Sequence, residues 1–208
     1  MTAKCCIGKS SGDPQTPPDV TSHEHETETK TLFPGVAVVT GAAGTGTHSH
    51  PERDLRSWLH VGIGNAVALT FAESGCTKIA ITDCNDALLS QTASTITTNL
   101  PDVDIWSTVG GISSERFVNS FIEGVLERFG RVDYCVNCAG ILSNNENSTE
   151  TSIEEFGRIN NVNYCGCWLT SRAELGTMLK QESSPNYDRS LLTNLIVASG
   201  LGIYRPPP

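Results

Sequence analysis

One part of the sequence restricts the fold of this chain more than any other. Residues 36–44, VAVVTGAAG, are a run of small apolar residues that ends in glycine. Such a run predicts a buried parallel strand that enters a tight turn. Residues 62–75, GIGNAVALTFAESG, predict a helix whose apolar face comprises Ala66, Val67, Leu69, Thr70 and Phe71 and which stops at Gly75.

Seventeen residues, 45–61, separate these two pieces and match the pattern of neither. Without them the flanks join as T-G-A-A-G-G-I-G, a strand, a glycine turn and a helix N-terminus. This is the arrangement in which backbone N–H groups meet a dinucleotide pyrophosphate. Residues 45–61 can be a surface insertion, a metal-binding pair formed by His48 and His50, or a translated intron. We favour the intron, because Gly44-Thr45 can be encoded with an internal GT, Val61-Gly62 with an internal AG, and seventeen codons keep the frame.

The rest of the chain divides into a tail and one domain. Residues 1–31 are polar, rich in Ser, Thr and Pro, and without periodicity, which predicts a disordered tail. Residues 32–208 are expected to form a partial dinucleotide-binding domain interrupted by the insertion 45–61. Further strands are predicted at 78–83, 103–109, 132–136 and 191–198, with helices between them. This alternation predicts an α/β fold, a doubly wound, Rossmann-like parallel sheet that is incomplete at the C-terminus.

Helix signals support this alternation. A helix is expected over 85–100, and a long helical stretch from Ser152 to about Gln181 with a kink near Gly166. Ser113 and Ser152 are predicted N-caps. The helix after Ser113 has its apolar residues at four-residue steps, which predicts that they lie in the core: Phe117, Phe121, Val125 and Phe129.

Charge and hydropathy exclude several classes of partner. The 208 residues include 14 Lys or Arg and 23 Asp or Glu, a formal net charge of −9, with no basic cluster. Nucleic acid is therefore not expected as a partner. No run approaches the ~20 apolar residues that cross a bilayer, and the N-terminus has no apolar leader. We expect no membrane association and a cytoplasmic location.

The cysteines are expected to be structural. Of eight, Cys84, Cys135, Cys138, Cys165 and Cys167 fall in or beside predicted elements at no framework-like spacing. We therefore interpret them mostly as small buried hydrophobic residues. Cys135 and Cys138 form a C-x-x-C at a strand end, which could be redox-active, but no second pair completes a zinc site and no metal site is predicted.

Asp83 ends the strand 78–83, nineteen positions after Gly64. A carboxylate about 20 residues after the glycine turn is typical of one that bonds the adenosine ribose hydroxyls. This position favours NAD over NADP, whose 2′-phosphate the carboxylate would repel, although NADP is not excluded. The structural alternative is that Asp83 is the N-cap of the next helix.

Three motifs in order give a family resemblance. T-G-x-x-x-G-x-G is matched by Thr40, Gly41, Gly62 and Gly64 once 45–61 is skipped, N-C-A-G is Asn137 to Gly140, and an Asn follows on the next helix at Asn163. With these motifs the chain resembles the short-chain dehydrogenase/reductase family, and its fungal members most. The resemblance implies NAD(P)-dependent hydride transfer on a small-molecule carbonyl or alcohol, with secondary metabolism as one setting. It implies a cofactor site of Thr40, Gly41, Gly62, Ile63, Gly64, Asp83, Asn137, Ala139 and Gly140.

The resemblance also implies catalytic residues. Ser199, in S-G-L-G after an apolar strand, would bond the substrate oxygen, and Asn163 would hold a water in a proton relay. Asn194 lies five residues before Ser199, where the family usually has an Asn three before, so an ordinary loop serine remains the alternative.

Two departures from the family pattern matter. Gly111 stands where an acidic residue usually bonds the adenine, and Y-x-x-x-K is absent, because no Lys follows Tyr204. We therefore expect an incomplete copy of the family's domain. The alternatives are a non-catalytic binding or regulatory protein and the product of a decayed or misread gene. Exposed apolar surface predicts poor solubility, and a homo-oligomer is left open.

Overall fold

The computed structural model describes residues 31–43, 62–142, 149–182 and 193–196. The predicted tail, apart from Thr31, and the insertion 45–61 lie outside them. The strands are β1 (Val36–Thr40), β2 (Lys78–Asp83), β3 (Asp104–Val109), β4 (Tyr134–Asn137) and β5 (Thr193–Ile196). The helices are α1 (Ile63–Glu73), α2 (Asp86–Asn99), α3 (Glu115–Phe129), α4 (Ile153–Asn160), the π-helical η2 (Asn161–Gly166) and α5 (Cys167–Met178). None of these helices is long and apolar enough to span a membrane.

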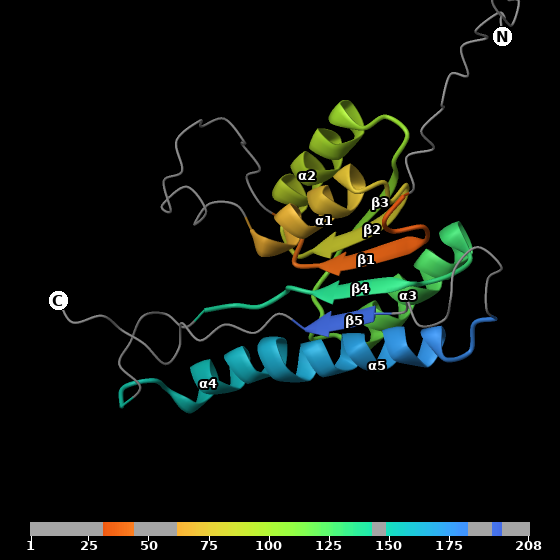
Figure 1. The fold of residues 1–208 in the computed structure, drawn as a ribbon. Helices are drawn as coiled ribbons and strands as arrows, with labels where there is room; N and C mark the ends of the chain where they lie inside the picture. Colours follow the sequence, from red (N-terminus) through yellow and green to blue (C-terminus); the bar gives the residue numbers. More distant parts are fainter. Residues whose placement is uncertain (1–30, 44–61, 143–148, 183–192, 197–208) are drawn as a thin grey trace, which may run out of the picture. The chain divides into compact units, whose positions relative to one another are not determined.

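The strands form one parallel sheet in the order β3-β2-β1-β4-β5 (Figure 1). The predicted doubly wound α/β fold is thus confirmed. Chain order runs outward in both directions from β1, so the sheet has its topological switch point between β1 and β4. In open sheets of this kind, ligands bind beyond the carboxyl ends of the strands at this point. The fold therefore indicates where a site is to be sought.

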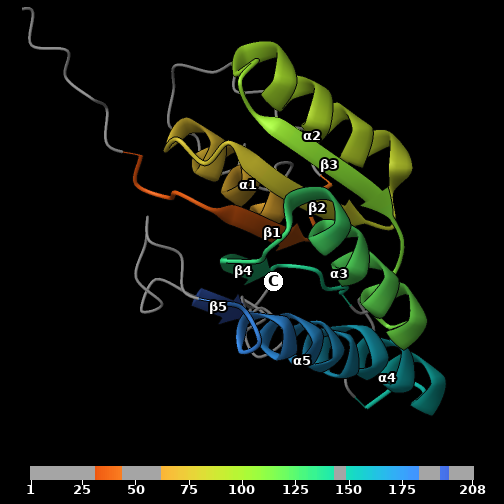
Figure 2. The ribbon, with the colours of Figure 1, turned by 90° about the vertical axis from the view of Figure 1, so that its right-hand side faces the viewer.

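Helices cover both faces of the sheet because β1 is apolar on both sides. Alternate residues of β1 point to opposite faces, and all five are buried. Ala37 and Val39 pack with α1 and α2, whereas Val36 and Val38 pack with α3 and Met178 of α5. Figure 1 shows α1 and α2 on one side of the sheet and α5 on the other, and Figure 2 shows α3 beside α5.

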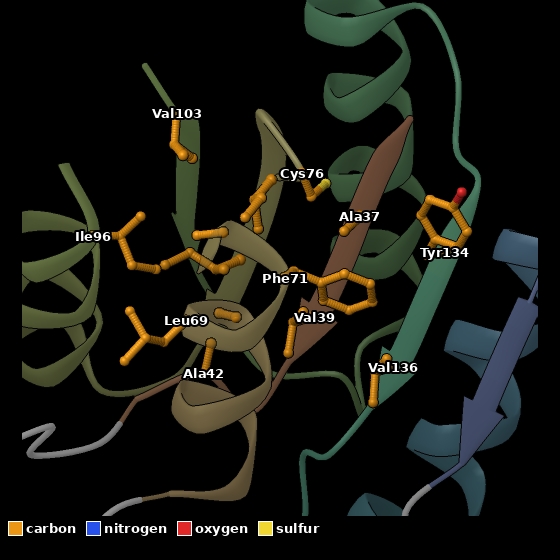
Figure 3. Packing of buried hydrophobic residues seen from close by; sticks show 14 of the residues in the cluster. Ala37, Val39, Ala42, Leu69, Phe71, Cys76, Ile96, Val103, Tyr134 and Val136 are labelled. Carbon is orange, nitrogen blue, oxygen red and sulfur yellow. The ribbon is translucent and has the colours of Figure 1, made fainter. Parts of the chain in front are cut away.

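Aromatic packing fixes α1 against the sheet. The ring of Phe71 lies 5.9 Å from that of Tyr134 on β4, and Phe33 meets both rings edge-on. Figure 3 shows Phe71 directed from α1 toward Val39 and Tyr134. The predicted apolar face of α1 needs a correction, because Thr70 is exposed and Ala68 and Ala72 are buried instead. Thr70 is the polar member of the predicted face and stays at the surface, where its hydroxyl donates to the Ala66 carbonyl of its own helix.

Two other helix predictions can be compared with the structure. The N-cap of α3 is Ser114, whose hydroxyl accepts from the Phe117 N–H, and the prediction of Ser113 was wrong by one residue because either serine satisfies the capping pattern. Ser152 caps α4 as predicted. The apolar face of α3 is in the core, and Phe121 and Val125 are almost fully buried.

The cysteine prediction was only partly right. Cys135 is fully buried, Cys138 and Cys167 are half-buried, and Cys84 and Cys165 are exposed. Cys84 follows the last residue of β2 at the sheet edge, and Cys165 lies on the outer side of η2, so neither belongs to a packed layer.

A buried carboxylate anchors the beginning of the central strand. Asp133 is 1% exposed, accepts a hydrogen bond of 2.9 Å from the Val36 N–H, and forms an ion pair with Arg131. A Cβ at Gly35 would lie 2.6 Å from the same carboxylate, so this corner has room only for glycine. Asp133 therefore joins the beginnings of β1 and β4, at the end of the sheet opposite the switch-point site.

Candidate functional site

Three strand ends define the candidate site. Thr40 of β1 pairs with Thr82 of β2 on one side and with Asn137 of β4 on the other, and Asp83 ends β2. Because all strands are parallel, their carboxyl ends lie along one edge of the sheet. The structure thereby brings together the predicted residues Thr40, Asp83 and Asn137 at the switch point.

The glycine turn after β1 is tightly closed. Gly41 has a φ of +70°, a left-handed conformation that favours glycine, and a Cβ there would lie 2.6 Å from the backbone of Ala139. The N–H groups of Gly41 and Ala42 both donate to the Thr82 carbonyl, at 2.9 and 3.2 Å. The turn therefore lies between β2 and the loop that follows β4.

The beginning of α1 meets this turn although 45–61 intervene in the sequence. A Cβ on Gly64 would collide with the Gly41 carbonyl oxygen and lie 3.0 Å from that of Thr40. Such close approach of a helix to a strand end is the role of the last glycine in a dinucleotide-binding turn. Gly41 and Gly64 are thus placed as the uninterrupted motif T-G-A-A-G-G-I-G would place them.

The N-terminus of α1 differs from those of α2, α3 and α4. Those helices are capped by Asn85, Ser114 and Ser152, and each has an acidic residue in its first turn. Gly62 precedes α1 without a side-chain cap, and the first turn, beginning with Ile63, has no acidic residue. Helix N-terminal N–H groups and the helix dipole attract anions. Among the described residues, this helix end is suited to a phosphate group.

Asp83 lies beside the turn as predicted from its spacing. One carboxylate oxygen accepts from the Ala43 N–H at 3.0 Å, and the other accepts from the Asn85 N–H at 3.0 Å. The alternative that Asp83 is the N-cap of α2 is not what the structure shows, because Asn85 is the cap. Asp83 is half-exposed, which leaves its carboxylate accessible to a ligand.

Asn137 links β4 to β1 by side-chain hydrogen bonds. Its amide oxygen accepts from the Thr40 hydroxyl at 3.3 Å, and the Thr40 oxygen accepts from the Ala139 N–H at 3.3 Å. The Cys138 N–H donates to the Thr40 carbonyl. N-C-A-G is therefore held against T-G by both backbone and side chains, which gives this side of the site a fixed shape.

Asn163 closes the same side from η2. Its amide pairs with the backbone of Ile141, donating to the carbonyl and accepting from the N–H, both at 2.8 Å. Gly140 passes so close that a Cβ there would lie 3.4 Å from the Asn163 amide oxygen. The π-helical η2 ends at Gly166, where a kink was predicted, and such segments are frequent at functional sites. Asn163 thus joins η2 to the loop after β4, and each end of its amide retains capacity for one further hydrogen bond.

Some predicted residues cannot be placed. Ser199, Tyr204, His48 and His50 lie outside the described residues. Gly111 lies between β3 and α3, and the nearest atom that a Cβ there would meet is the Ser113 hydroxyl at 3.9 Å. In the part of the chain that the structure describes, no cluster of three or more His, Cys, Asp or Glu could hold a metal ion.

Sequence reasoning missed one residue next to the site. Glu174 of α5 is fully buried, and its carboxylate accepts from the Asn137 amide at 2.7 Å. The available signal was a glutamate in phase with the buried Thr170, Ser171 and Met178, because a helix buries residues three and four apart on one face.

The C-x-x-C thiols are not activated. Burial raises the pKa of Cys138 to about 11. Burial, and then the negative charge of Glu174, raise the pKa of the Cys135 thiol well above its ordinary value. Thiolate is the reactive form, so this environment does not support the redox alternative.

We expect iodoacetamide to distinguish the thiols of the folded protein at neutral pH. The exposed Cys165 is alkylated early, whereas Cys138 and Cys135 stay unmodified until the protein unfolds. Raising the pH toward 11 speeds labelling of Cys138, because its thiolate forms only near its raised pKa. Peptide mapping by mass spectrometry measures the order, and early neutral-pH labelling of Cys138 would contradict it.

Fold and site define a class of protein, a parallel α/β domain with a dinucleotide-type glycine turn at its switch point. Comparisons with known proteins agree. Residues 59–193 match the family model described as Enoyl-(Acyl carrier protein) reductase. The chain is 34% identical over 125 residues to the short-chain dehydrogenase fogB of Aspergillus ruber. The aligned region covers 58% of this chain and 45% of that protein.

Solved structures of dehydrogenases are also similar to this chain. A Thermococcus sibiricus alcohol dehydrogenase complexed with 5-hydroxy-NADP has a TM-score of 0.56 and 31% identity, covering 69% of this chain and 53% of that one. An NAD+-bound xylitol dehydrogenase has a TM-score of 0.59 and 27% identity, covering 71% and 49%. The chain belongs to the short-chain dehydrogenase/reductase family, a family of oxidoreductases that use NAD(P). It spans about half the length of the curated relatives it matches.

Proposed function

We propose that this chain provides the dinucleotide-binding part of an NAD(P)-dependent oxidoreductase that acts on a small-molecule carbonyl or alcohol. The observation that supports the proposal is the approach of Gly64 to the Gly41 carbonyl, because this close approach would form a phosphate-binding turn at the switch point. The N–H groups at the start of α1 would hold the pyrophosphate, and Ala139 and Gly140 would border the nicotinamide half of the cofactor. The bound nicotinamide would supply or accept the hydride, and the protein would supply orientation and electrostatics.

The assignment of residues 45–61 is part of this proposal. The glycine turn and α1 already meet in the arrangement of the uninterrupted motif, so the working turn needs none of the seventeen residues. Each N–H of a phosphate-binding turn is aimed at a charge, and extra backbone would disturb that aim. We infer that 45–61 are foreign to the functional domain, as a translated intron would be.

The substrate proposal rests on the family. Relatives and structural neighbours carry the names levodione reductase, alcohol dehydrogenase and xylitol dehydrogenase. A secondary-metabolite carbonyl is the narrower version, supported by the similarity to a fungal short-chain dehydrogenase. Ser199 would bond the substrate oxygen, and Asn163, whose amide bonds the Ile141 backbone, would hold a water in the proton relay.

Asp83 favours NAD(H) over NADP(H) in this proposal. Its carboxylate lies at the end of β2, bonded to the turn through Ala43, where a ribose hydroxyl donor would find an acceptor and a 2′-phosphate would meet a like charge. A hydrogen bond to a charged group contributes about 1.5–3 kcal/mol. Loss of this contact should therefore change affinity by about tenfold or more.

Titration with NADH and NADPH, followed by nicotinamide fluorescence, tests both parts of the proposal. We expect NADH to bind more tightly to the unmodified protein. The substitution Asp83→Ser should weaken NADH and strengthen NADPH, each by about tenfold. Asp86→Ser is the matched control, because it removes the same charge from an exposed position in the first turn of α2 and should leave the ratio unchanged. Equal affinity of the Asp83→Ser variant and the parent for both cofactors would contradict the NAD assignment.

A further inference from the structure

The buried carboxylate of Glu174 is the strongest feature of the molecule that the proposed function does not use. Glu174 is on α5, with no exposed surface, and Asn137 is at the end of β4. Their side chains meet at 2.7 Å, with the Asn137 amide nitrogen donating to the carboxylate. Burying a carboxylate is costly unless it is hydrogen-bonded, so this contact marks a specific role for the pair.

This contact is the first in a series of hydrogen bonds that ends at Ala139 in the N-C-A-G loop. The Glu174 carboxylate accepts from the NH2 group of Asn137, so the amide directs its oxygen toward Thr40 of β1. The Thr40 hydroxyl then donates to that oxygen and is left to accept the Ala139 N–H. Each step fixes the orientation of the next one, from α5 to the N-C-A-G loop.

The alternative orientation of the amide would break this chain. With its NH2 group toward Thr40, the amide would place its oxygen against the Glu174 oxygen that now accepts from it, and this hydrogen bond would be lost. The Asn137 NH2 group also donates to the Ser171 hydroxyl, but this contact is much longer, at 3.5 Å. Glu174 is therefore the group that selects the orientation seen in the structure.

We propose that Glu174 is a positioning residue that orients the Asn137 amide and, through Thr40, fixes the Ala139 backbone where the nicotinamide half of the cofactor would lie. The link to the cofactor rests on the proposed function. The hydrogen-bond chain itself does not, because it joins only groups of this chain. The two parts can therefore be tested separately.

Native-state hydrogen exchange of the full chain tests the positioning role directly. Glu174→Met keeps most of the side-chain volume and removes the acceptor, and we expect the Ala139 N–H to exchange about tenfold faster relative to the other protected amides. Glu174→Gln offers its own carbonyl oxygen to Asn137 and should restore the protection. Met178→Ala is the control, because Met178 is buried on the same helix in the hydrophobic cluster with Val36 and Val38 and should affect all core amides alike.

The same variants give a second readout. The Kd for NADH should rise about tenfold in Glu174→Met and stay near the parent value in Glu174→Gln. If Glu174→Met does not fold, the exchange rate of the Asn137 side-chain amide protons in the unmodified protein tests the bond to Glu174 instead. Slow exchange of one of them supports the bond to Glu174, and exchange as fast as that of an exposed amide overturns it.

Two outcomes distinguish a failure of the proposed function from a failure of the positioning role. A protein that binds no dinucleotide but shows the expected change at Ala139 would overturn the proposed function and retain Glu174 as the positioning residue. A protein that binds NADH, with Ala139 in Glu174→Met no more exposed to exchange than in Met178→Ala, would overturn the positioning role alone.

Discussion

Excision of residues 45–61 should strengthen NADH binding by about 10²–10⁴-fold. The deletion joins Gly44 to Gly62 and leaves a short connection between Gly41 and Gly64, which already touch. The shorter connection would aim the N–H groups at the start of α1 at the pyrophosphate more accurately than a turn with seventeen extra residues. Two such charge-assisted hydrogen bonds, at about 1.5–3 kcal/mol each, account for the expected gain. Fluorescence titration of the intact and excised proteins measures it.

A glycine control separates the turn from other effects of the deletion. Gly64→Ala in the excised protein places a methyl group against the Gly41 carbonyl and should abolish the gain. Sequencing of the transcript across codons 44 to 62 checks the origin of the segment, and we expect the seventeen codons to be missing from the mature message. Equal affinity of the intact and excised proteins would show that 45–61 are compatible with a working turn.

The substitution Asp133→Ala should lower the free energy of unfolding by about 2–4 kcal/mol. It removes the acceptor of the buried Val36 N–H and breaks the ion pair with Arg131 at the beginning of the central strand. Arg131 is partly exposed, which reduces the cost relative to a fully buried pair. The loss is a large part of the roughly 5–15 kcal/mol that stabilises a typical protein.

Asp104→Ala is the matched control for this effect. Asp104 also pairs with an arginine, Arg128, but both side chains are about half exposed. Surface ion pairs contribute roughly 0–1 kcal/mol. Urea denaturation of both variants measures the difference, and a loss in Asp133→Ala no larger than that in Asp104→Ala would contradict the anchoring role of Asp133.

The order and packing of the elements could be predicted because the apolar pattern is strong. The run Val36–Val39 is apolar at every position, a pattern typical of a strand that is covered on both faces. In the structure, β1 is buried on both faces. The first residue of a helix was harder to predict where two neighbouring residues could both act as its N-cap. Ser113 and Ser114 both fit a cap, and the structure uses Ser114 because its hydroxyl reaches the Phe117 N–H.

The site could be predicted only where spacing carries the information. Gly41, Gly64 and Asp83 follow from motif spacing, and the structure brings them to one edge of the sheet. Glu174 could not be found in this way. It is 37 residues from Asn137 in sequence, and its role depends on the packing of α5 against β4. A buried glutamate in a sequence has the same letter as an exposed one, and only the fold distinguishes them.

The central claim is that the turn between β1 and α1 holds a dinucleotide. Its most direct test is a titration of the 15N-labelled protein, with and without residues 45–61, against NADH, followed by backbone amide shifts. We predict that the largest changes occur at Ala42, Ala43, Gly62–Gly64 and Ala139, and that they are stronger in the excised protein. Absence of shifts at these amides in both proteins, or shifts confined to another part of the fold, would contradict the claim.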